Sequence, residues 1–498
     1  KMRRRRTPNG AELKILKVCA RSVIFLAPVL LAGCLDEDNR QRSSARGAGP
    51  LPATSDQINR SGKGDRLVIH VRAKRPSLAR ARARAHDLIA PGTIMPGGTP
   101  LSGFYQALIA LQTGLRQDPV TILHLGDSHI ASDGFSGDLR EKFQRRFGDA
   151  GRGMMMPGFA FPYYRARGVT FGHRGKWTAA NSFAGDAGPY GLSGVRLSAR
   201  EAGASLSLTS ARGAFEWAEV AFATQAKGGA ATVSFGGAKQ RVETGAEGEK
   251  IKRVRIARKG RRLEIETKDA SRVSVLSVSV GNNRPGIRYV NFGIPGATAD
   301  TPQRWDERFV ADDLARLKPD LIVLGYGTNE GFNDGLDPES YGARVTALVK
   351  RLKGGAPKAS FLILGPPDAA RLPRFARGKA KDAGANAPCR ALSETERRDY
   401  AALRKAKSPA LARWHPPPKL SAVRTSLRRV AEKQGAYFWD WSRVMKGPCG
   451  IQAWARADPP LAAGDRVHLR PAGAKRSASA LFEELMAGYE AHVKLASR

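Results

Sequence analysis

Cysteine and histidine are scarce in this sequence, with four and eight residues among 498. No two histidines stand in an H-x-x-x-H spacing, and no cluster of cysteine and histidine has the pattern of a metal site. Zinc-finger spacings and aromatic–basic ribonucleoprotein signatures are absent as well. The sequence therefore predicts no metal, no other cofactor and no nucleic-acid partner.

Long apolar runs are also missing. The longest, residues 22–33, has about 12 residues, whereas a membrane-spanning helix needs roughly 20. It follows the basic run Arg3 to Arg6, which is the order of a secretory signal peptide. It ends in Leu31-Ala32-Gly33-Cys34, which resembles the lipobox of bacterial lipoproteins. The resemblance implies a signal peptide over 1–33, acylation of Cys34 and a lipid-anchored protein of the periplasm or cell envelope. A plain signal peptide with a chance cysteine is the alternative.

Acidic residues are few: 45 Asp and Glu stand against 83 Lys and Arg, for a net charge of +38. Such a charge favours anionic partners, among them polymers of the cell envelope. The basic residues are spread along the whole chain, so a generally solvated basic surface explains them too.

Two cysteines remain outside the export signal, and both follow a proline in polar segments: Cys389 and Cys449. In an oxidising compartment such a pair is expected to form a disulfide. Two free thiols are the alternative, although exposed thiols are a liability outside the cell.

The composition changes along the chain in a way that predicts several domains. Residues 34–100 are polar or Pro/Gly-rich and indicate a tether. Strands and helices alternate over 101–167 and again over 286–498, which predicts an α/β domain with a parallel sheet and helices on both faces. Residues 168–285 read instead as short alternating strands, and predict an inserted all-β sandwich. The strands expected in the α/β part are 120–125, 288–292, 321–324, 360–364 and 436–439, and those in the insertion are 204–209, 215–222, 231–235, 251–256, 262–267 and 272–280. The helices expected are 104–115, 137–147, 301–317, 338–352, 420–434 and 471–492.

Four motifs lie at the ends of predicted strands or at the start of a helix, where open α/β sheets bind their ligands. They are Gly126-Asp127-Ser128-His129, the segment 291–298 (NFGIPGAT), the segment 325–330 (GYGTNE) and Asp465-Arg466-Val467-His468. Each alone is a weak signal, since capping serines, tight turns and solvated histidines are common. Their order, Ser, Gly, Asn and Asp-x-x-His, resembles the SGNH (GDSL-like) hydrolase family.

This resemblance implies a three-layer α/β/α domain and a serine esterase. It makes Ser128 the nucleophile, His468 the general base and then acid, and Asp465 the residue that orients His468. The oxyanion hole would combine the Ser128 N–H, the Gly296 N–H and the Asn329 side chain. Gly293 is the alternative to Gly296 as the glycine of the oxyanion hole, but the position of Gly296 fits the spacing of the family's motif better.

Two departures from the commoner motifs stand out, because the first motif ends in His129 rather than Leu and the third in Glu330 rather than Asp. With the following segment 130–133 and the β insertion, they make the chain similar to the periplasmic peptidoglycan O-acetylesterases, whose jelly-roll module, similar to carbohydrate-binding modules, is inserted at this point. An acetylated polysaccharide is then the expected partner. An O-acetyltransferase on the same scaffold and a non-catalytic glycan-binding lipoprotein remain as alternatives.

Overall fold

The computed structural model describes residues 99–161, 164–377 and 387–496, all within the compact unit of residues 73–498. The predicted signal peptide, Cys34 and residues 34–98 of the predicted tether lie outside the described residues. Within the described ranges, no helix combines the length and hydropathy that a membrane crossing requires.

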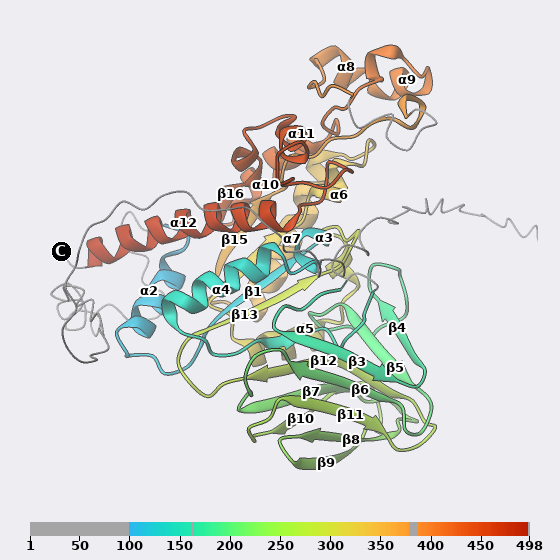
Figure 1. Cartoon of the computed structure of the whole chain (residues 1–498), viewed down its shortest axis with the longest axis vertical. Helices are drawn as coiled ribbons and strands as arrows, with labels where there is room; N and C mark the ends of the chain where they lie inside the picture. Colours follow the sequence, from blue (N-terminus) through green and yellow to red (C-terminus); the bar gives the residue numbers. More distant parts are fainter. Residues whose placement is uncertain (1–98, 162–163, 378–386, 497–498) are drawn as a thin grey trace, which may run out of the picture. The chain divides into compact units, whose positions relative to one another are not determined.

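Five parallel strands form the central sheet, as predicted (Figure 1). Their spatial order is β13 (Ile287–Gly293), β1 (Val120–Gly126), β14 (Leu321–Gly325), β15 (Ser360–Gly365) and β16 (Tyr437–Asp440). The strands read as continuous apolar runs because helices cover both faces of the sheet. β1 lies between β13 and β14, the next two strands of this sheet along the chain, so the strand order reverses at β1. A ligand site is expected in the crevice at the carboxyl end of this strand.

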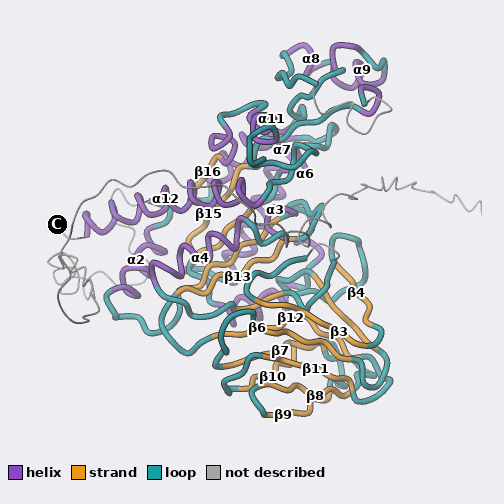
Figure 2. Tube along the Cα trace, in the orientation of Figure 1, coloured by secondary structure: helices purple, strands orange, loops and turns teal. Residues whose placement is uncertain are grey.

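Residues alternate between two cores along each strand. Ile122 of β1 packs in one core with helices α2 (Ser102–Gln112), α4 (Phe135–Phe147) and α12 (Pro471–Ala496). Leu123 packs in the other core, which includes α5 (Glu307–Leu317), α7 (Pro338–Gly355) and α10 (Leu420–Lys433). The result is the three-layer α/β/α arrangement that the sequence predicts, visible as helices on both sides of the strands in Figure 2. Shorter helices are α3 (Ser128–Ala131), α6 (Thr328–Gly331), α8 (Glu394–Arg398), α9 (Tyr400–Lys405) and α11 (Gly450–Ala455), with 3₁₀ turns η1 (Thr301–Arg304), η2 (Arg374–Ala376), η3 (Pro409–Leu411) and η4 (Trp441–Met445).

The helix expected over 301–317 is wrong in its first third. Thr301–Arg304 form the 3₁₀ turn η1, and Trp305 is extended at φ −80° and ψ 141°. Asp306 then caps α5, because its side chain accepts the backbone N–H of Arg308 and Phe309. Burial of the Trp305 ring, whose Nε1 donates to Ser182 Oγ at 3.1 Å, favours this break over a continuous helix.

The insertion contains two antiparallel sheets that share a hydrophobic core. The strand order in the first sheet is β10 (Ile251–Ile256), β7 (Trp217–Ala223), β12 (Val273–Gly281), β5 (Val195–Ala199) and β4 (Trp177–Asn181). β2 (Gly153–Met155) pairs with β12 of this sheet. The strand order in the second sheet is β3 (Val169–Arg174), β6 (Ser205–Ser210), β11 (Arg262–Thr267), β8 (Ala230–Phe235) and β9 (Ala238–Glu243). The predicted all-β character is confirmed. Its jelly-roll topology and the domain boundaries at 168 and 286 stay predictions.

Five strands of these two sheets have no counterpart among those expected: β2, β3, β4, β5 and β9. β3, β4 and β9 are edge strands with largely exposed residues, so their hydrophobic alternation is weak.

Cys389 and Cys449 form a disulfide in this structure. The bond joins a segment paired with Trp414 to the residue that precedes α11. It links the segment between β15 and α10 to the segment that follows β16.

Candidate active site

Ser128 lies at the tight turn between β1 and α3. Gly126 ends the strand, and a Cβ on it would lie 2.5 Å from Ile130 Cγ1 and 2.7 Å from the Gly325 carbonyl oxygen. Glycine is therefore required for the close approach of strand and helix. The Asp127 side chain caps α3 by accepting the His129 N–H at 3.0 Å. Ser128 is the first residue of α3, so its side chain projects at the carboxyl edge of the sheet.

A chain of two hydrogen bonds joins three of the predicted site residues. Ser128 Oγ lies 3.0 Å from His468 Nε2, although 340 positions separate them in the chain. His468 Nδ1 lies 2.6 Å from Asp465 Oδ2. The other carboxylate oxygen, Oδ1, accepts the backbone N–H of Val467 at 2.9 Å and of His468 at 3.0 Å. The structure thus brings the serine, histidine and aspartate of the first and fourth motifs together.

The charge of Asp465 fixes the tautomer of His468. Burial raises the pKa of Asp465, but the hydrogen bond and charge of His468 and the two backbone donors outweigh it and lower the value to about 2. An ionised carboxylate can only accept, so Nδ1 of His468 carries the hydrogen. In the neutral imidazole Nε2 is then free to accept the hydroxyl hydrogen of Ser128, which is the arrangement of an activated nucleophile.

The two glycines of the second motif have different surroundings. Gly293 is buried against α3, where a Cβ would lie 2.2 Å from the Ala131 nitrogen, so its role is packing. Gly296 is partly exposed at φ +82°, in the loop after β13, beside the Phe183 ring. Asn329 reaches this loop, since its Nδ2 donates to the Ala297 carbonyl at 2.8 Å. One N–H of the amide is used there, and a second remains.

Gly296 and Asn329 therefore lie together at the carboxyl ends of the two strands that flank β1. Among the described residues, neither hydrogen-bonds to Ser128. A substrate oxygen between them and Ser128 is what would join the three donors predicted for an oxyanion hole.

Glu330 is a buried carboxyl beside this loop, only 4% exposed. Its Oε1 accepts the Ala299 N–H at 2.8 Å, while Oε2 has no partner among the described residues. Burial raises its pKa to about 7, against the opposing effect of the Ala299 hydrogen bond.

His129 has a contact that the sequence did not predict. Its Nδ1 lies 3.2 Å from Asp127 Oδ1, and its Nε2 lies 3.1 Å from the Val467 carbonyl oxygen. The ring stacks on that of His468 with centroids 5.7 Å apart. Burial lowers the pKa of His129, but the charge of Asp127 and the hydrogen bonds to Asp127 and Val467 together raise it by more, so the net shift of the pKa is upward. His129 thereby joins the Ser128 helix to the His468 loop.

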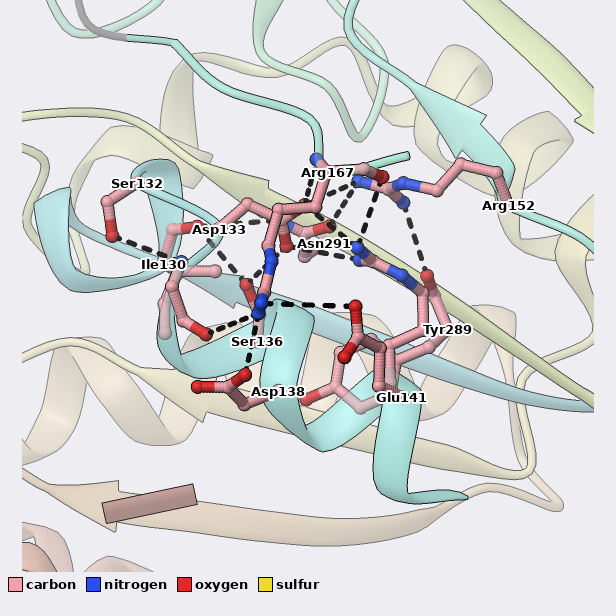
Figure 3. A network of polar contacts seen from close by, with 12 residues as sticks. Ile130, Ser132, Asp133, Ser136, Asp138, Glu141, Arg152, Arg167, Tyr289 and Asn291 are labelled. Carbon is pink, nitrogen blue, oxygen red and sulfur yellow. Dashed lines mark hydrogen bonds and ion pairs between the residues drawn. The ribbon is translucent and has the colours of Figure 1, made fainter. Parts of the chain in front are cut away.

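A buried polar network supports the other side of α3 (Figure 3). Asp133, fully buried at φ +51°, accepts two hydrogen bonds from Arg140 at 3.0 and 3.1 Å. Its carboxylate also contacts Arg152 at 3.3 Å and the Arg167 N–H at 2.7 Å. Burial raises the pKa of Asp133, but the charges of Arg140 and Arg152 outweigh this effect, so the net shift of the pKa is downward.

The same network reaches β13. Arg152 donates to Asn291 Oδ1 at 2.9 Å, and Asn291 Nδ2 donates to the Ile130 carbonyl at 3.3 Å. These contacts hold α3 against both the central sheet and the segments that lead into the β module. No group of three His, Cys, Asp or Glu in the described part of the chain is arranged to hold a metal ion.

Comparison with known proteins gives a family match for part of the chain. Residues 267–476 match the model of the GDSL-like Lipase/Acylhydrolase family. That span contains the second, third and fourth motifs, whereas Ser128 precedes it, on the far side of most of the β module. No curated protein matches the chain.

Among solved structures, a peptidoglycan O-acetylesterase matches with a TM-score of 0.60 at 24% identity, over 79% of this chain and 97% of that one. A carbohydrate esterase family 2 enzyme with a carbohydrate binding domain from Corynascus thermopiles (Myceliophthora fergusii) has a TM-score of 0.27 at 12% identity, over 58% and 95%. A GDSL-like lipase from Bacteroides thetaiotaomicron has a TM-score of 0.24 at 14% identity, over 40% and 76%. The peptidoglycan O-acetylesterase shares its fold with this chain over almost the whole length of the esterase.

Proposed function

Because the chain carries a domain of the GDSL-like lipase/acylhydrolase family, we propose that it is a serine esterase that removes O-acetyl groups from a cell-envelope polysaccharide, namely peptidoglycan. The observation that carries the proposal is the hydrogen-bonded series Ser128, His468 and Asp465 at the carboxyl end of β1. The fold shared with a peptidoglycan O-acetylesterase and the positive net charge support the choice of polymer.

The reaction follows from these positions. His468 Nε2 takes the hydroxyl proton of Ser128 while Oγ attacks the acetyl carbonyl carbon. Negative charge then collects on the carbonyl oxygen, where the N–H groups of Ser128 and Gly296 and the Asn329 amide donate hydrogen bonds. Asp465 stabilises the imidazolium. The sugar hydroxyl leaves with the proton of His468. Water, deprotonated by the same imidazole, hydrolyses the acetyl-enzyme and releases acetate.

Release of acetate from O-acetylated peptidoglycan by the purified protein tests this function. We expect acetate from the native polymer and from a small aryl acetate, and none with Ser128→Ala. Ser132→Ala is the matched control, because Ser132 also follows the turn but its hydroxyl, within the described residues, bonds only to the His129 carbonyl, at 3.3 Å, and to the Gly134 N–H, at 3.4 Å. Hydrolysis of the aryl ester alone would contradict the peptidoglycan assignment. Transfer of acetyl to an added glycan in place of acetate release would identify a transferase.

We propose also that the protein is exported and anchored by acylation of Cys34, on the strength of the Leu31-Ala32-Gly33-Cys34 motif after its apolar run. Metabolic labelling with radioactive palmitate in a bacterial host tests this. Label is expected on the intact chain and lost with Cys34→Ser. A labelled Cys34→Ser protein would contradict the anchor.

A further inference from the structure

A cavity of about 430 Å³ lies at the end of the sheet opposite Ser128. Residues 117–119, which lead into β1, form part of its wall, and Ser128 lies beyond the other end of this seven-residue strand, about 23 Å along. The remaining wall comes from β7, β10 and β12 of the β module and residues 282–284 after it, from β2, from the start of β13 and from the end of α5. The cavity is therefore separate from the candidate active site.

Positive charge dominates the lining. Its charged residues are Arg255, Arg284, Arg288 and Arg316 against Asp118 and Glu219. The carboxylate of Glu219 is already paired with other arginines. Arg316 donates hydrogen bonds to its two oxygens at 3.1 and 2.5 Å, and a guanidinium nitrogen of Arg255 lies 3.7 Å away.

Arg288 has no direct ion-pair partner in the described part of the chain, and the carboxylates of Glu219 and Asp118 act on it only at longer range. Its guanidinium makes no hydrogen bond or ion pair with any residue of the described part of the chain, but it lies over the Trp217 ring in a cation–π contact, 5.3 Å from the ring centre. The Nε of Arg288 and the Nε1 of Trp217 are both buried donors with no acceptor among the described residues. Burial, together with the charges of Arg255 and Arg316, lowers the pKa of Arg288 to about 10. A guanidinium in this position is unfavourable until an anion enters.

We propose that this cavity binds a sugar-sized ligand through a carboxylate or phosphate group, with Arg288 as the principal contact. The volume lies in the range of small-molecule sites, about 300–1,000 Å³, and exceeds what a lone inorganic anion fills. A planar guanidinium binds both carboxylate and phosphate through paired N–H groups. The site goes beyond the esterase function and uses none of the residues proposed for it.

Isothermal titration calorimetry of the full chain tests the site with four probes: N-acetylmuramic acid, glucose 1-phosphate, inorganic phosphate and N-acetylglucosamine. We expect binding of at least one of the two charged sugars and none of neutral N-acetylglucosamine. Arg288→Gln should weaken that binding at least tenfold. Arg262→Gln, a change of an exposed arginine on β11 outside the cavity, should leave it unchanged. The identity of the stronger charged sugar distinguishes carboxylate from phosphate.

Thermal melting keeps the test independent of a folding defect. Because Arg288 makes no ion pair in the described part of the chain and its contact with the Trp217 ring is long, at 5.3 Å, Arg288→Gln should melt close to the parent. The charged sugar should raise the melting temperature of the parent alone. Binding of inorganic phosphate only, equal binding by Arg288→Gln, or no binding of either charged sugar would overturn the proposal.

Discussion

His129 Nε2 donates a hydrogen bond to the Val467 carbonyl oxygen across 3.1 Å, and so joins the residue after Ser128 to the residue before His468. A carbonyl and a carboxylate can only accept, so the contacts of His129 to Val467 and Asp127 need hydrogens on both ring nitrogens. The upward pKa shift agrees with an imidazolium. We infer that His129 is a positioning residue, which sets the distance between Ser128 and His468.

Replacing His129 by leucine should therefore lower kcat more than it changes KM. Displacement of a reacting group by about 1 Å costs up to roughly 100-fold in rate, so we expect a 10-fold to 100-fold fall in kcat on an aryl acetate. His129→Gln, which can still donate to one partner, should recover part of the loss. Steady-state kinetics check this, and a kcat for His129→Leu equal to that of the parent would contradict the positioning role.

The same contacts predict a pH dependence of stability. Since the folded-state pKa of His129 is raised above its ordinary 6.5, its stabilising effect is complete below pH 6.5 and declines as the pH rises through the folded value. The free energy of unfolding should fall over this range in the parent and change less in His129→Leu. Urea denaturation between pH 6 and 9 measures it; parallel curves for the two proteins would refute the imidazolium.

Asp465→Asn tests the orientation of the base. The substitution keeps the shape but turns one acceptor oxygen into an NH2 donor. With its oxygen held by the backbone N–H groups of Val467 and His468, the NH2 faces Nδ1 of His468 and favours the wrong tautomer, so we expect kcat to fall about 10³–10⁴-fold. Because the pKa of Asp465 is about 2, its carboxylate is ionised at all ordinary assay pH values, and its titration should leave no inflection above pH 4 in the rate profile. Asp458→Asn, in an exposed segment nearby in sequence, serves as the control. Activity within tenfold of the parent would exclude this role.

Much of the α/β domain was predictable because its signals are local. Buried parallel strands such as Leu321–Gly325 are continuous apolar runs, and the carboxyl ends of such strands meet at one edge. The proximity of Ser128 to the Asn329 loop follows from that rule alone. Edge strands such as Ala238–Glu243 were missed because exposure on both faces removes the alternation on which the prediction depends.

Contacts between distant segments were not predictable in this way. Nothing in the local sequence of His129 indicates that Val467, 338 positions away, approaches its ring. Arg288 likewise has the pattern of an ordinary polar residue at the start of a strand. That it has no ion-pair partner in the described part of the chain appears only once Glu219 is seen to pair with Arg316. The surroundings of Arg288 depend on how the β module packs against the sheet, and those of His129 on where the loop that carries Val467 returns to α3.

Glu330 should make stability depend on pH in a separate range. Its pKa is raised from 4.5 to about 7, so the native state is favoured below pH 4.5 and loses about 3 kcal/mol of stability as the pH rises through 7. Glu330→Gln keeps an acceptor for the Ala299 N–H and removes the charge. We expect it to exceed the parent in free energy of unfolding by up to about 3 kcal/mol at pH 8 and to match it near pH 4.

Urea denaturation at the two pH values measures this difference. Glu339→Gln, a change of an exposed residue in the first turn of α7, is the control and should show no such difference. Equal stability of Glu330→Gln and the parent at pH 8 would mean that the buried carboxyl is accommodated without a penalty.

Phe183 is expected to contribute to recognition of the polymer. Its side chain belongs to the β module, is 45% exposed and covers Gly296, since a Cβ on that glycine would lie 2.8 Å from Phe183 Cζ. Arg304 holds the backbone in place by donating to the Ser182 and Phe183 carbonyls at 2.9 and 3.1 Å. An exposed aromatic ring on an anchored backbone beside the proposed oxyanion hole offers an apolar surface to a sugar ring.

Phe183→Ala should accordingly raise KM for O-acetylated peptidoglycan about 5-fold to 20-fold, a loss of roughly 1–2 kcal/mol, because the extended substrate loses an apolar contact. The kinetics on a small aryl acetate should change less than twofold, since that substrate does not extend across the β module. Leu115→Ala, which removes another exposed apolar side chain after α2, controls for a general effect. An equal change on both substrates would place Phe183 in the support of Gly296 rather than in polymer binding, and initial-rate measurements on the two substrates decide between these roles.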